Sequence, residues 1–289
     1  MLGIGLGLGR QVRRATPSAS LVLDTLSVMP EAWLSLEKVK SDYDGPSLRI
    51  RRDSDNVETD IGFNGVEPDT GAILSFAGSD SAYVSRVYDK TGNGRHWSQA
   101  VAAYQPKALN AGALTLHGTK LVLSGGRLLL DDTSGIITGA DGATILSLAA
   151  TPNTSGYESL AWATTANSTR TELGVGIGSG GLSRVGYFRV TTLGTLSTIT
   201  GTQAIGLNEL TLSIVTANYV AGAAAMYTNG VSDGSRSIPA GAITDVSAEI
   251  ATPSADISAT VAMCGVFNSV LTPGDRAALT DYALARKAA

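Results

Sequence analysis

The segment best able to carry chemistry is 87–99, VYDKTGNGRHWSQ. A predicted strand is followed by a glycine-rich turn and then by a guanidinium, an imidazole and an indole. Sugar binding needs hydrogen-bonding groups for hydroxyls beside an aromatic ring that stacks on C–H faces. The pattern therefore predicts a carbohydrate-binding loop. Its five residues are Asp89, Asn93, Arg95, His96 and Trp97.

A purely structural role for the same segment is also open. Asp89 and Asn93 are residue types that hydrogen-bond local backbone in tight turns. Calcium takes six to eight oxygen ligands, and these two side chains fall far short of that. Zinc would need more ligands than His96 and His117, which have no cysteine near them. We predict no metal and no cofactor.

Catalytic carboxylates are not identified by the sequence. A retaining glycosidase needs two carboxyl groups about 5 to 5.5 Å apart, a distance that spacing along one chain does not define. For each candidate, the favoured interpretation is a solvated strand or loop carboxylate. We therefore expect a protein without enzymatic activity and keep a hydrolase as the alternative. The candidates in the second half are Glu158, Glu172, Glu209 and Asp233.

These residues must be positioned by a β-rich scaffold. The chain has 34 glycines in 289 residues and is 43% hydrophobic but only 16% charged, which favours turns and strands around an ordered core. Short apolar runs recur with Ser, Thr, Gly and Asn between them, as in a sandwich or jelly roll. Strands are predicted at 47–52, 57–61, 83–88, 113–116, 120–123, 127–130, 143–149, 159–164, 171–177, 185–190, 208–215, 223–228, 248–251 and 259–267.

Three helices are predicted, over 29–43, 69–76 and 272 to about 285. Asp69 is a suitable cap for the second. Thr272 and Asp275 have the spacing of a capping box at the start of the third. Asn229 and Gly230 both accept positive φ and predict a tight hairpin.

A second hairpin is predicted from the strands at 47–52 and 57–61, which the turn at 53–56 joins. In the first of these strands Leu48 and Ile50 alternate with Arg49 and Arg51, which predicts one apolar face and one charged face.

Composition excludes several partners. The net charge of −4 does not suit a polyphosphate, so no nucleic acid is expected. No apolar run approaches the roughly 18 residues that span a bilayer, so no membrane is expected. Cys264 is the only cysteine, which excludes an intrachain disulfide and predicts a small buried side chain.

The chain start predicts an arm. Met1 to Gly9 alternates Leu or Ile with Gly and precedes Arg10, an order of apolar and charged residues that differs from a secretory signal. A flexible arm that orders against a partner, or an assembly arm that enters a neighbouring subunit, would explain it. We divide the chain into an arm at 1–28 and one domain at 29–289.

Two stretches resemble known families. Residues 43–63, YDGPSLRIRRDSDNVETDIGF, with VYDKTGNGRHWSQA and the later Gln105-Pro106, resemble the opening of the catalytic domain of family 54 α-L-arabinofuranosidases. The same block, within roughly residues 35–130, resembles part of many phage tail-associated proteins. The end of the chain, FNSVLTPGDRAALTDYALAR, resembles the closing strand and helix of laminin G-like and lectin-like modules. These resemblances imply an all-β, concanavalin A-like jelly-roll β-sandwich.

The resemblance implies function only in part. Those enzymes place their catalytic carboxylates in the later half, near a vicinal cysteine pair that this chain lacks. We therefore expect a non-enzymatic phage virion component, a tail or capsid appendage with a lectin-like domain for host glycan attachment or virion assembly. Repeated copies would offset weak single-site affinity, so a homo-oligomer is expected, with the arm binding other virion proteins. The alternatives are an arabinofuranosidase-like glycoside hydrolase and a purely structural protein.

Overall fold

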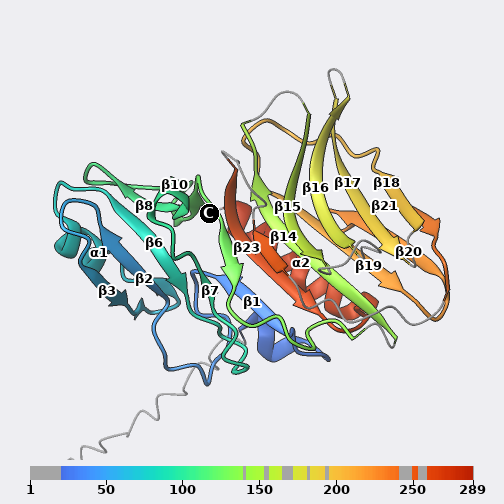
Figure 1. The fold of residues 1–289 in the computed structure, drawn as a ribbon, viewed down its shortest axis with the longest axis horizontal. Coiled ribbons are helices and arrows are strands. Elements are labelled where there is room, and N and C mark those ends of the chain that lie inside the picture. The colour runs from blue at the N-terminus through green and yellow to red at the C-terminus, as the bar shows by residue number, and fades with distance from the viewer. Residues whose placement is uncertain are drawn as a thin grey trace, which may run out of the picture.

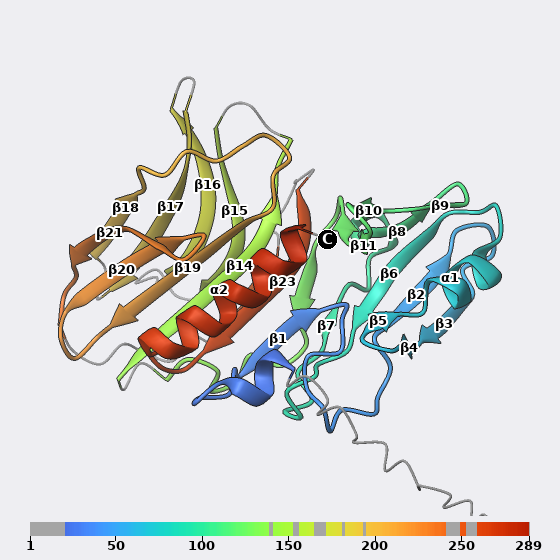
Figure 2. The same ribbon diagram turned by 180° about the vertical axis from the view of Figure 1, so that it is seen from behind.

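The computed structural model describes residues 21–138, 141–152, 156–164, 172–180, 183–192, 195–240, 249–252 and 259–288. Antiparallel pairing connects most strands into one continuous network, which folds into two long sheets, and the helix α2 (Pro273–Ala288) lies along the outer face of the first (Figures 1 and 2). The predicted all-β sandwich is confirmed. No helix in the described ranges is long and apolar enough to cross a membrane.

The sheet beneath α2 has a central strand that is buried on both faces. All nine residues of β14 are buried, because odd positions such as Ile145 face one core cluster and even positions such as Leu146 face another. A strand covered on both sides needs no apolar–polar alternation, which explains its continuous apolar run. The strand order is β21 (Val231–Ser237), β20 (Ala223–Thr228), β19 (Thr211–Asn218), β14 (Gly142–Ala150), β23 (Thr260–Phe267), β1 (Ala32–Ser35).

The second sheet runs from the sandwich into a smaller lobe, at the left of Figure 1. Its order is β18 (Thr195–Thr200), β17 (Ser183–Thr192), β16 (Glu172–Gly180), β15 (Gly156–Thr164), β22 (Glu249–Thr252), β13 (Leu128–Leu130), β7 (Trp97–Ser98), β6 (Ala82–Val87), β2 (Leu48–Arg52), β3 (Glu58–Ile61).

Shorter elements connect the two sheets. Strand β8 pairs with β6 and with β12, and β12 also pairs with β23. The bounds of these elements are β4 (Phe63–Asn64), β5 (Glu67–Pro68), β8 (Lys107–Asn110), β9 (Ala113–Leu114), β10 (Leu116–His117), β11 (Lys120–Leu121), β12 (Leu123–Ser124) and the 3-10 helices η1 (Val22–Thr25) and η2 (Ala102–Tyr104).

The predicted C-terminal helix and its capping box are confirmed. The Asp275 N–H donates to Thr272 Oγ1 at 3.1 Å, and the Thr272 hydroxyl donates back to the Asp275 carboxylate at 2.6 Å. The same carboxylate accepts from the backbone N–H of Ser27 at 2.7 Å. The cap therefore also holds the η1 segment. Leu279 and Ala283 of α2 pack in the cluster on the outer face of the first sheet.

The predicted helix at 69–76 and both predicted hairpins are also confirmed. Helix α1 (Thr70–Ala77) begins at Asp69, whose side chain accepts from the Ala72 N–H at 3.0 Å. Strands β2 and β3 pair as expected, and β20 turns into β21 at Asn229 and Gly230, which have φ of 50° and 82°.

The predicted helix at 29–43 is wrong. The chain forms strand β1 there and pairs with the edge of β23. Trp33 is buried edge-on against Phe267, with ring centroids 6.4 Å apart, over the glycine at 265. Pairing with an open sheet edge outweighs helical spacing because tertiary packing overrides local propensity. Cys264 is buried, as expected for a small core residue, and lies opposite Leu34 in the pairing of β1 with β23.

The segment 21–28, which we assigned to the arm, packs on the folded body. Val22 and Leu23 are buried in the cluster under α2, and the Leu23 N–H donates to the Val39 carbonyl at 3.0 Å. Residues 1–20 lie outside the described residues. The expected assembly role of the arm stays a prediction.

Two neighbouring glycines are expected to differ in how much stability the protein loses when each is replaced by alanine. Gly126 has φ +87°, and a Cβ there would lie 2.8 Å from the Gln105 carbonyl carbon and also overlap the Tyr104 carbonyl oxygen. Gly125 has φ +63° with open space around it. We expect Gly126→Ala to destabilise by about 3 kcal/mol and Gly125→Ala by about 1 kcal/mol in chemical denaturation. Equal losses would show that backbone overlap is not the cause.

Candidate functional site

Asp89, the first residue of the predicted sugar-binding loop, organises the turn from within. It is buried and accepts from the Thr91 N–H (3.1 Å), the Thr91 hydroxyl (2.6 Å) and the Gly94 N–H (3.0 Å). These bonds occupy its oxygens with local donors. The structural interpretation of this residue therefore describes it better than a direct sugar contact.

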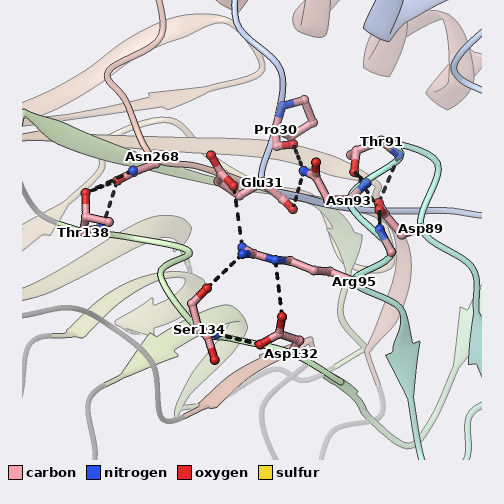
Figure 3. A network of polar contacts seen from close by, with 11 residues as sticks. Pro30, Glu31, Asp89, Thr91, Asn93, Arg95, Asp132, Ser134, Thr138 and Asn268 are labelled. Carbon is pink, nitrogen blue, oxygen red and sulfur yellow. Dashed lines mark hydrogen bonds and ion pairs between the residues drawn. The ribbon is translucent and has the colours of Figure 1, made fainter.

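Asn93 and Arg95 join separate parts of the chain (Figure 3). The Asn93 amide donates to the Glu31 carbonyl at 3.1 Å. Arg95 donates to the Ser134 carbonyl at 2.8 Å and lies 3.6 Å from the Glu31 carboxylate and 4.0 Å from that of Asp132. Asn93 thus ties the loop to the segment before β1, and Arg95 ties it both to that segment and to the segment after β13.

Trp97 does not present the exposed ring that we expected. It is 0% exposed, because β7 pairs with both β6 and β13 and Trp97 lies opposite Val87 and Leu130, all within the core. A ring without solvent exposure cannot stack on a sugar in this conformation. The expectation of an exposed platform at Trp97 is corrected accordingly.

His96 is the member of the predicted set that leads to a surface site. Its Nδ1 accepts from the Asp89 N–H at 3.1 Å, and its ring packs edge-on against Tyr88 at 5.1 Å. Burial, with the nearby Arg86 charge, lowers the pKa of His96, so the ring is neutral at pH 7. The His96 ring therefore packs as a neutral group against one side of the Tyr88 ring.

A row of polar residues crosses the face of the small sheet opposite its core. Cross-strand pairing aligns Asp60, Arg49, Arg86 and Ser98, which we call the polar row. Arg49 binds the Asp60 carboxylate through two nitrogens at 2.7 and 3.0 Å. Arg86 donates to Ser98 Oγ at 3.0 Å, and the Ser98 hydroxyl donates to Asp131 at 3.0 Å. The row is already organised by its own bonds.

Tyr88 lies against this row. The guanidinium carbons of Arg49 and Arg86 are 6.0 and 5.9 Å from its ring centroid. Its hydroxyl donates to Asp60 at 2.7 Å. Burial and this hydrogen bond raise the pKa of Tyr88, while the hydrogen bond from Arg49 lowers the pKa of Asp60. The phenol therefore stays a donor and the carboxylate an acceptor.

A cavity of about 200 Å³, the Ser85 cavity, adjoins the polar row. The register between β2 and β6 skips Ser85, which is therefore a bulge residue. Ser85 is 9% exposed, and its hydroxyl has no hydrogen-bond partner among the described residues. The cavity is lined by Arg49, Glu58, Ser85, Arg86, Ser98, Gln99, Ala100 and Gln105.

The amides in the Ser85 cavity are held by neighbouring groups. Arg51, on the same strand as Arg49 but buried, donates from Nε to the Gln105 side-chain oxygen at 2.8 Å. The Gln105 amide donates to the Gln99 carbonyl at 2.9 Å. A side chain fixed before a ligand binds loses less conformational entropy on binding.

A second, larger hollow of about 510 Å³ lies beyond Asp60, and we call it the aromatic hollow. Tyr43 and Phe63 line it, packed edge-on with centroids 6.2 Å apart. Burial raises the pKa of Tyr43 to about 12. Asp60 also lines the hollow, and its partner Arg49 lines the Ser85 cavity. The Arg49–Asp60 pair thus separates two neighbouring hollows.

The four candidate carboxylates do not form a described catalytic pair. Asp233 is buried and accepts from the Thr202 N–H and the Thr228 hydroxyl, each at 2.6 Å. Glu209 forms an ion pair with Lys287. Glu158 and Glu172 lie on β15 and β16, with side chains outside the described residues. Within the described ranges, no cluster of three or more His, Cys, Asp or Glu is arranged to hold a metal.

We expect the stability of the protein to depend on pH through Lys90, which is buried next to Tyr88. Its ammonium donates to the carbonyls of Ser47 (2.9 Å) and Tyr88 (2.8 Å), and burial lowers its pKa to about 7. An unfolded lysine keeps its proton to about pH 10.4, so between these values the unfolded state binds more protons. Stability should therefore rise from pH 7 to pH 10, by up to about 1.4 kcal/mol per unit.

Lys90→Met provides the control for this pH dependence. Urea unfolding of the two proteins at pH 7, 8 and 9 should give a smaller slope of stability against pH for the variant. An identical slope in both proteins would exclude Lys90 as its source.

Comparison with known proteins identifies solved structures with a similar fold. No protein-family profile and no curated protein matches the chain. Solved structures do match. A GH54 α-L-arabinofuranosidase soaked with a cyclic sulfate inhibitor has a TM-score of 0.68 and 15% identity, covering 90% of this chain and 63% of that one. An arabinofuranosidase complexed with arabinofuranosyl-α-1,2-xylobiose has a TM-score of 0.70 and 15% identity, covering 92% and 64%.

The fold is shared. The binding domain of Paraclostridial Mosquitocidal Protein 1 matches more distantly, with a TM-score of 0.52, 13% identity and coverage of 70% and 51%. The present chain spans less than two thirds of the length of the two arabinofuranosidase structures. Similarity at this identity describes architecture, and it agrees with the sandwich expected from the resemblance of residues 43–63.

The polar row and both hollows were missed by the sequence analysis. The alternation of Arg49 and Arg51 with apolar residues correctly predicted a charged face on β2. Pairing Arg49 with Asp60 across the predicted hairpin would have found half of the row. Ser85 gives no sequence signal, because its position depends on a bulge that only the three-dimensional pairing reveals.

Proposed function

We propose that this protein binds glycans through the Ser85 cavity and the polar row. The observation that carries the proposal is the Ser85 hydroxyl, buried at the cavity wall without a hydrogen-bond partner among the described residues. A buried polar group without a partner costs about 1 to 3 kcal/mol, which a hydrogen bond to a ligand hydroxyl would recover once the Ser85 side chain rotates toward the cavity.

The cavity offers the groups that sugar hydroxyls need. A hydroxyl both donates and accepts, and the wall supplies a carboxylate acceptor at Glu58, guanidinium donors at Arg49 and Arg86, and amides that do both. Existing hydrogen bonds hold the two arginines and the two amides in place before binding. A few convergent polar groups in a concave site are typical of small-molecule recognition.

The structural neighbours support this proposal by their fold. One of them is an arabinofuranosidase complexed with arabinofuranosyl-α-1,2-xylobiose, and another is the binding domain of Paraclostridial Mosquitocidal Protein 1. We propose binding without hydrolysis, because the described carboxylates Asp233 and Glu209 are engaged by donors that hold the fold. Release of reducing sugar from a bound glycan would favour the hydrolase alternative.

We also propose that the protein acts as a phage virion appendage. This rests on the resemblance of residues 43–63 and 87–100 to phage tail-associated proteins, and on the alternating Gly and Leu or Ile of residues 1–9. The purified chain should then be a homo-oligomer by light scattering. Deleting residues 1–20 should abolish assembly and leave the melting temperature unchanged. Normal assembly of the truncated protein would contradict an assembly arm.

Two substitutions test the glycan site. Ser85→Ala removes a hydroxyl that has no described partner, so it should keep or raise thermal stability while weakening glycan binding about 5-fold to 10-fold. Arg86→Ala should weaken binding about 10-fold to 100-fold, the range for a hydrogen bond to a charged group. Isothermal titration with the best glycan from an array gives both values.

Arg236→Ala is the matched control, because Arg236 is an exposed arginine on β21, outside the site. Its affinity should equal that of the wild type. Unchanged affinity in both Ser85→Ala and Arg86→Ala would place the binding site elsewhere.

A further inference from the structure

We infer that the aromatic hollow is a second saccharide subsite, so that the ligand is a neutral oligosaccharide spanning both hollows across the Arg49–Asp60 pair. This inference rests on the proposed function and specifies its ligand class. It adds two requirements for the ligand, which must contain more than one sugar residue and must carry no charge.

The two hollows are consecutive along one edge of the small sheet. Glu58 on β3 lines the Ser85 cavity, and Asp60, two residues further on, lines the aromatic hollow together with Gly62. Alternate residues of a strand share a face and lie about 7 Å apart. That step is comparable to one sugar residue. A ligand filling one hollow would therefore reach the other with its next residue.

The pair between the hollows can contact a ligand from both sides. Arg49 and Asp60 are bound to each other through both oxygens of the carboxylate, and the Tyr88 hydroxyl donates to the same carboxylate. The bonds fix these groups, while the two side chains remain about 40% exposed. Exposed edges of a fixed guanidinium and carboxylate can donate to and accept from neighbouring sugar hydroxyls.

The aromatic hollow supplies the apolar contact that the Ser85 cavity lacks. Phe63 and Tyr43 are partly exposed, and their edge-on packing fixes both rings. The Tyr43 hydroxyl donates to the Pro46 carbonyl at 2.8 Å, and the Lys90 ammonium lies 5.9 Å from the Phe63 ring centroid. Two held rings beside a carboxylate suit a sugar with one C–H face and one hydroxyl edge.

The charges along the two hollows disfavour an acidic sugar. Lys38 lies 3.9 Å from Asp44 and Arg49 lies 2.7 Å from Asp60. Arg86, in the same way, lies 3.5 Å from Asp131. Glu58 adds a further carboxylate to the lining. A uronic or sialic acid would bring a negative charge to a surface whose cations already have carboxylate partners.

The test measures affinity against chain length and charge. Titration calorimetry would use xylobiose, arabinofuranosyl-α-1,2-xylobiose, neutral xylo- and malto-oligosaccharides up to the hexamer, their monosaccharides, lactose and α2,3-sialyllactose. Wild-type protein should bind at least one oligosaccharide 10-fold or more tightly than its monosaccharide, and should bind sialyllactose no more tightly than lactose.

Two variants locate the second subsite. Phe63→Leu keeps an apolar side chain without the ring, and Asp44→Asn changes a side chain that is 95% exposed and so leaves folding intact. Phe63→Leu should lower oligosaccharide affinity about 10-fold with monosaccharide affinity unchanged. Asp44→Asn should lower oligosaccharide affinity by a smaller factor.

The outcomes separate the two proposals. Equal affinity for monosaccharide and oligosaccharide, or tighter binding of sialyllactose than lactose, would overturn the second subsite and leave glycan binding at the Ser85 cavity standing. Equal loss of both affinities in Phe63→Leu would do the same. Absence of wild-type binding to the whole panel would overturn the glycan-binding proposal itself.

Discussion

Replacing Arg286 with alanine is expected to lower the unfolding free energy by about 3 to 5 kcal/mol, the range for breaking a buried ion pair. Arg286 pairs with Glu37, and their side chains are 2% and 7% exposed. Arg286 also donates to the Leu121 carbonyl at 2.9 Å. The pair fixes the C-terminal end of α2 beside β10 and β11 (Figure 2).

The size of this effect comes from the charge that remains. Burial lowers the pKa of Arg286 to about 10, so the guanidinium keeps its charge at neutral pH. Without Arg286, the partners that remain to the Glu37 carboxylate among the described residues are the Tyr282 hydroxyl and Lys120, the latter at 3.5 Å. The expected fall in Tm is on the order of 10 °C.

Lys287→Ala is the matched control for Arg286→Ala. Lys287 is the next residue of α2 and pairs with Glu209 at the surface. Surface ion pairs contribute about 0 to 1 kcal/mol, so this variant should melt within a few degrees of the wild type. The double variant Glu37→Ala, Arg286→Ala should lose less than the two single losses added together. A loss in Arg286→Ala no larger than in Lys287→Ala would contradict the buried clamp.

Trp97→Ala is the second substitution with a large expected effect. Truncating a fully buried tryptophan costs about 3 to 5 kcal/mol, because transfer energy is lost and a cavity remains. The indole N–H has no hydrogen-bond partner in the described part of the chain, so the contribution of Trp97 comes from packing. Differential scanning calorimetry should show a fall in Tm of roughly 10 °C.

Trp97→Phe separates packing from recognition. It keeps an aromatic ring and removes the N–H, so it should cost less than half as much as alanine. Below their melting temperatures both variants should bind glycan within about 2-fold of wild type, since Trp97 does not line either hollow. A Trp97→Ala protein with unchanged Tm and lost glycan binding would support the sugar-binding loop that the sequence suggested.

The fold was predictable wherever interactions between residues close in the sequence determine the conformation of an element. The capping box at Thr272 and Asp275 and the Asn229-Gly230 turn use local chemistry, and both are present. The segment around Trp33 was mispredicted because its conformation depends on pairing with β23, more than two hundred residues away. Spacing along the chain cannot detect an open sheet edge.

The site was less predictable because its chemistry comes from exposure and register. The loop at 89–97 has residue types suited to sugars, yet Asp89 and Trp97 are buried and serve the turn and the core. The polar row takes one residue from each of four paired strands, β3, β2, β6 and β7, and Ser85 lines its cavity through a bulge. Residue type alone does not distinguish an inward from an outward side chain near a bulge.

The most direct test of glycan binding is a single titration series on wild-type protein, Ser85→Ala and the control Arg236→Ala, using the best glycan from an array. We expect micromolar to millimolar binding by wild type and Arg236→Ala, with Ser85→Ala about 5-fold to 10-fold weaker at equal or higher Tm. Equal affinity in all three proteins would contradict a glycan site at the Ser85 cavity.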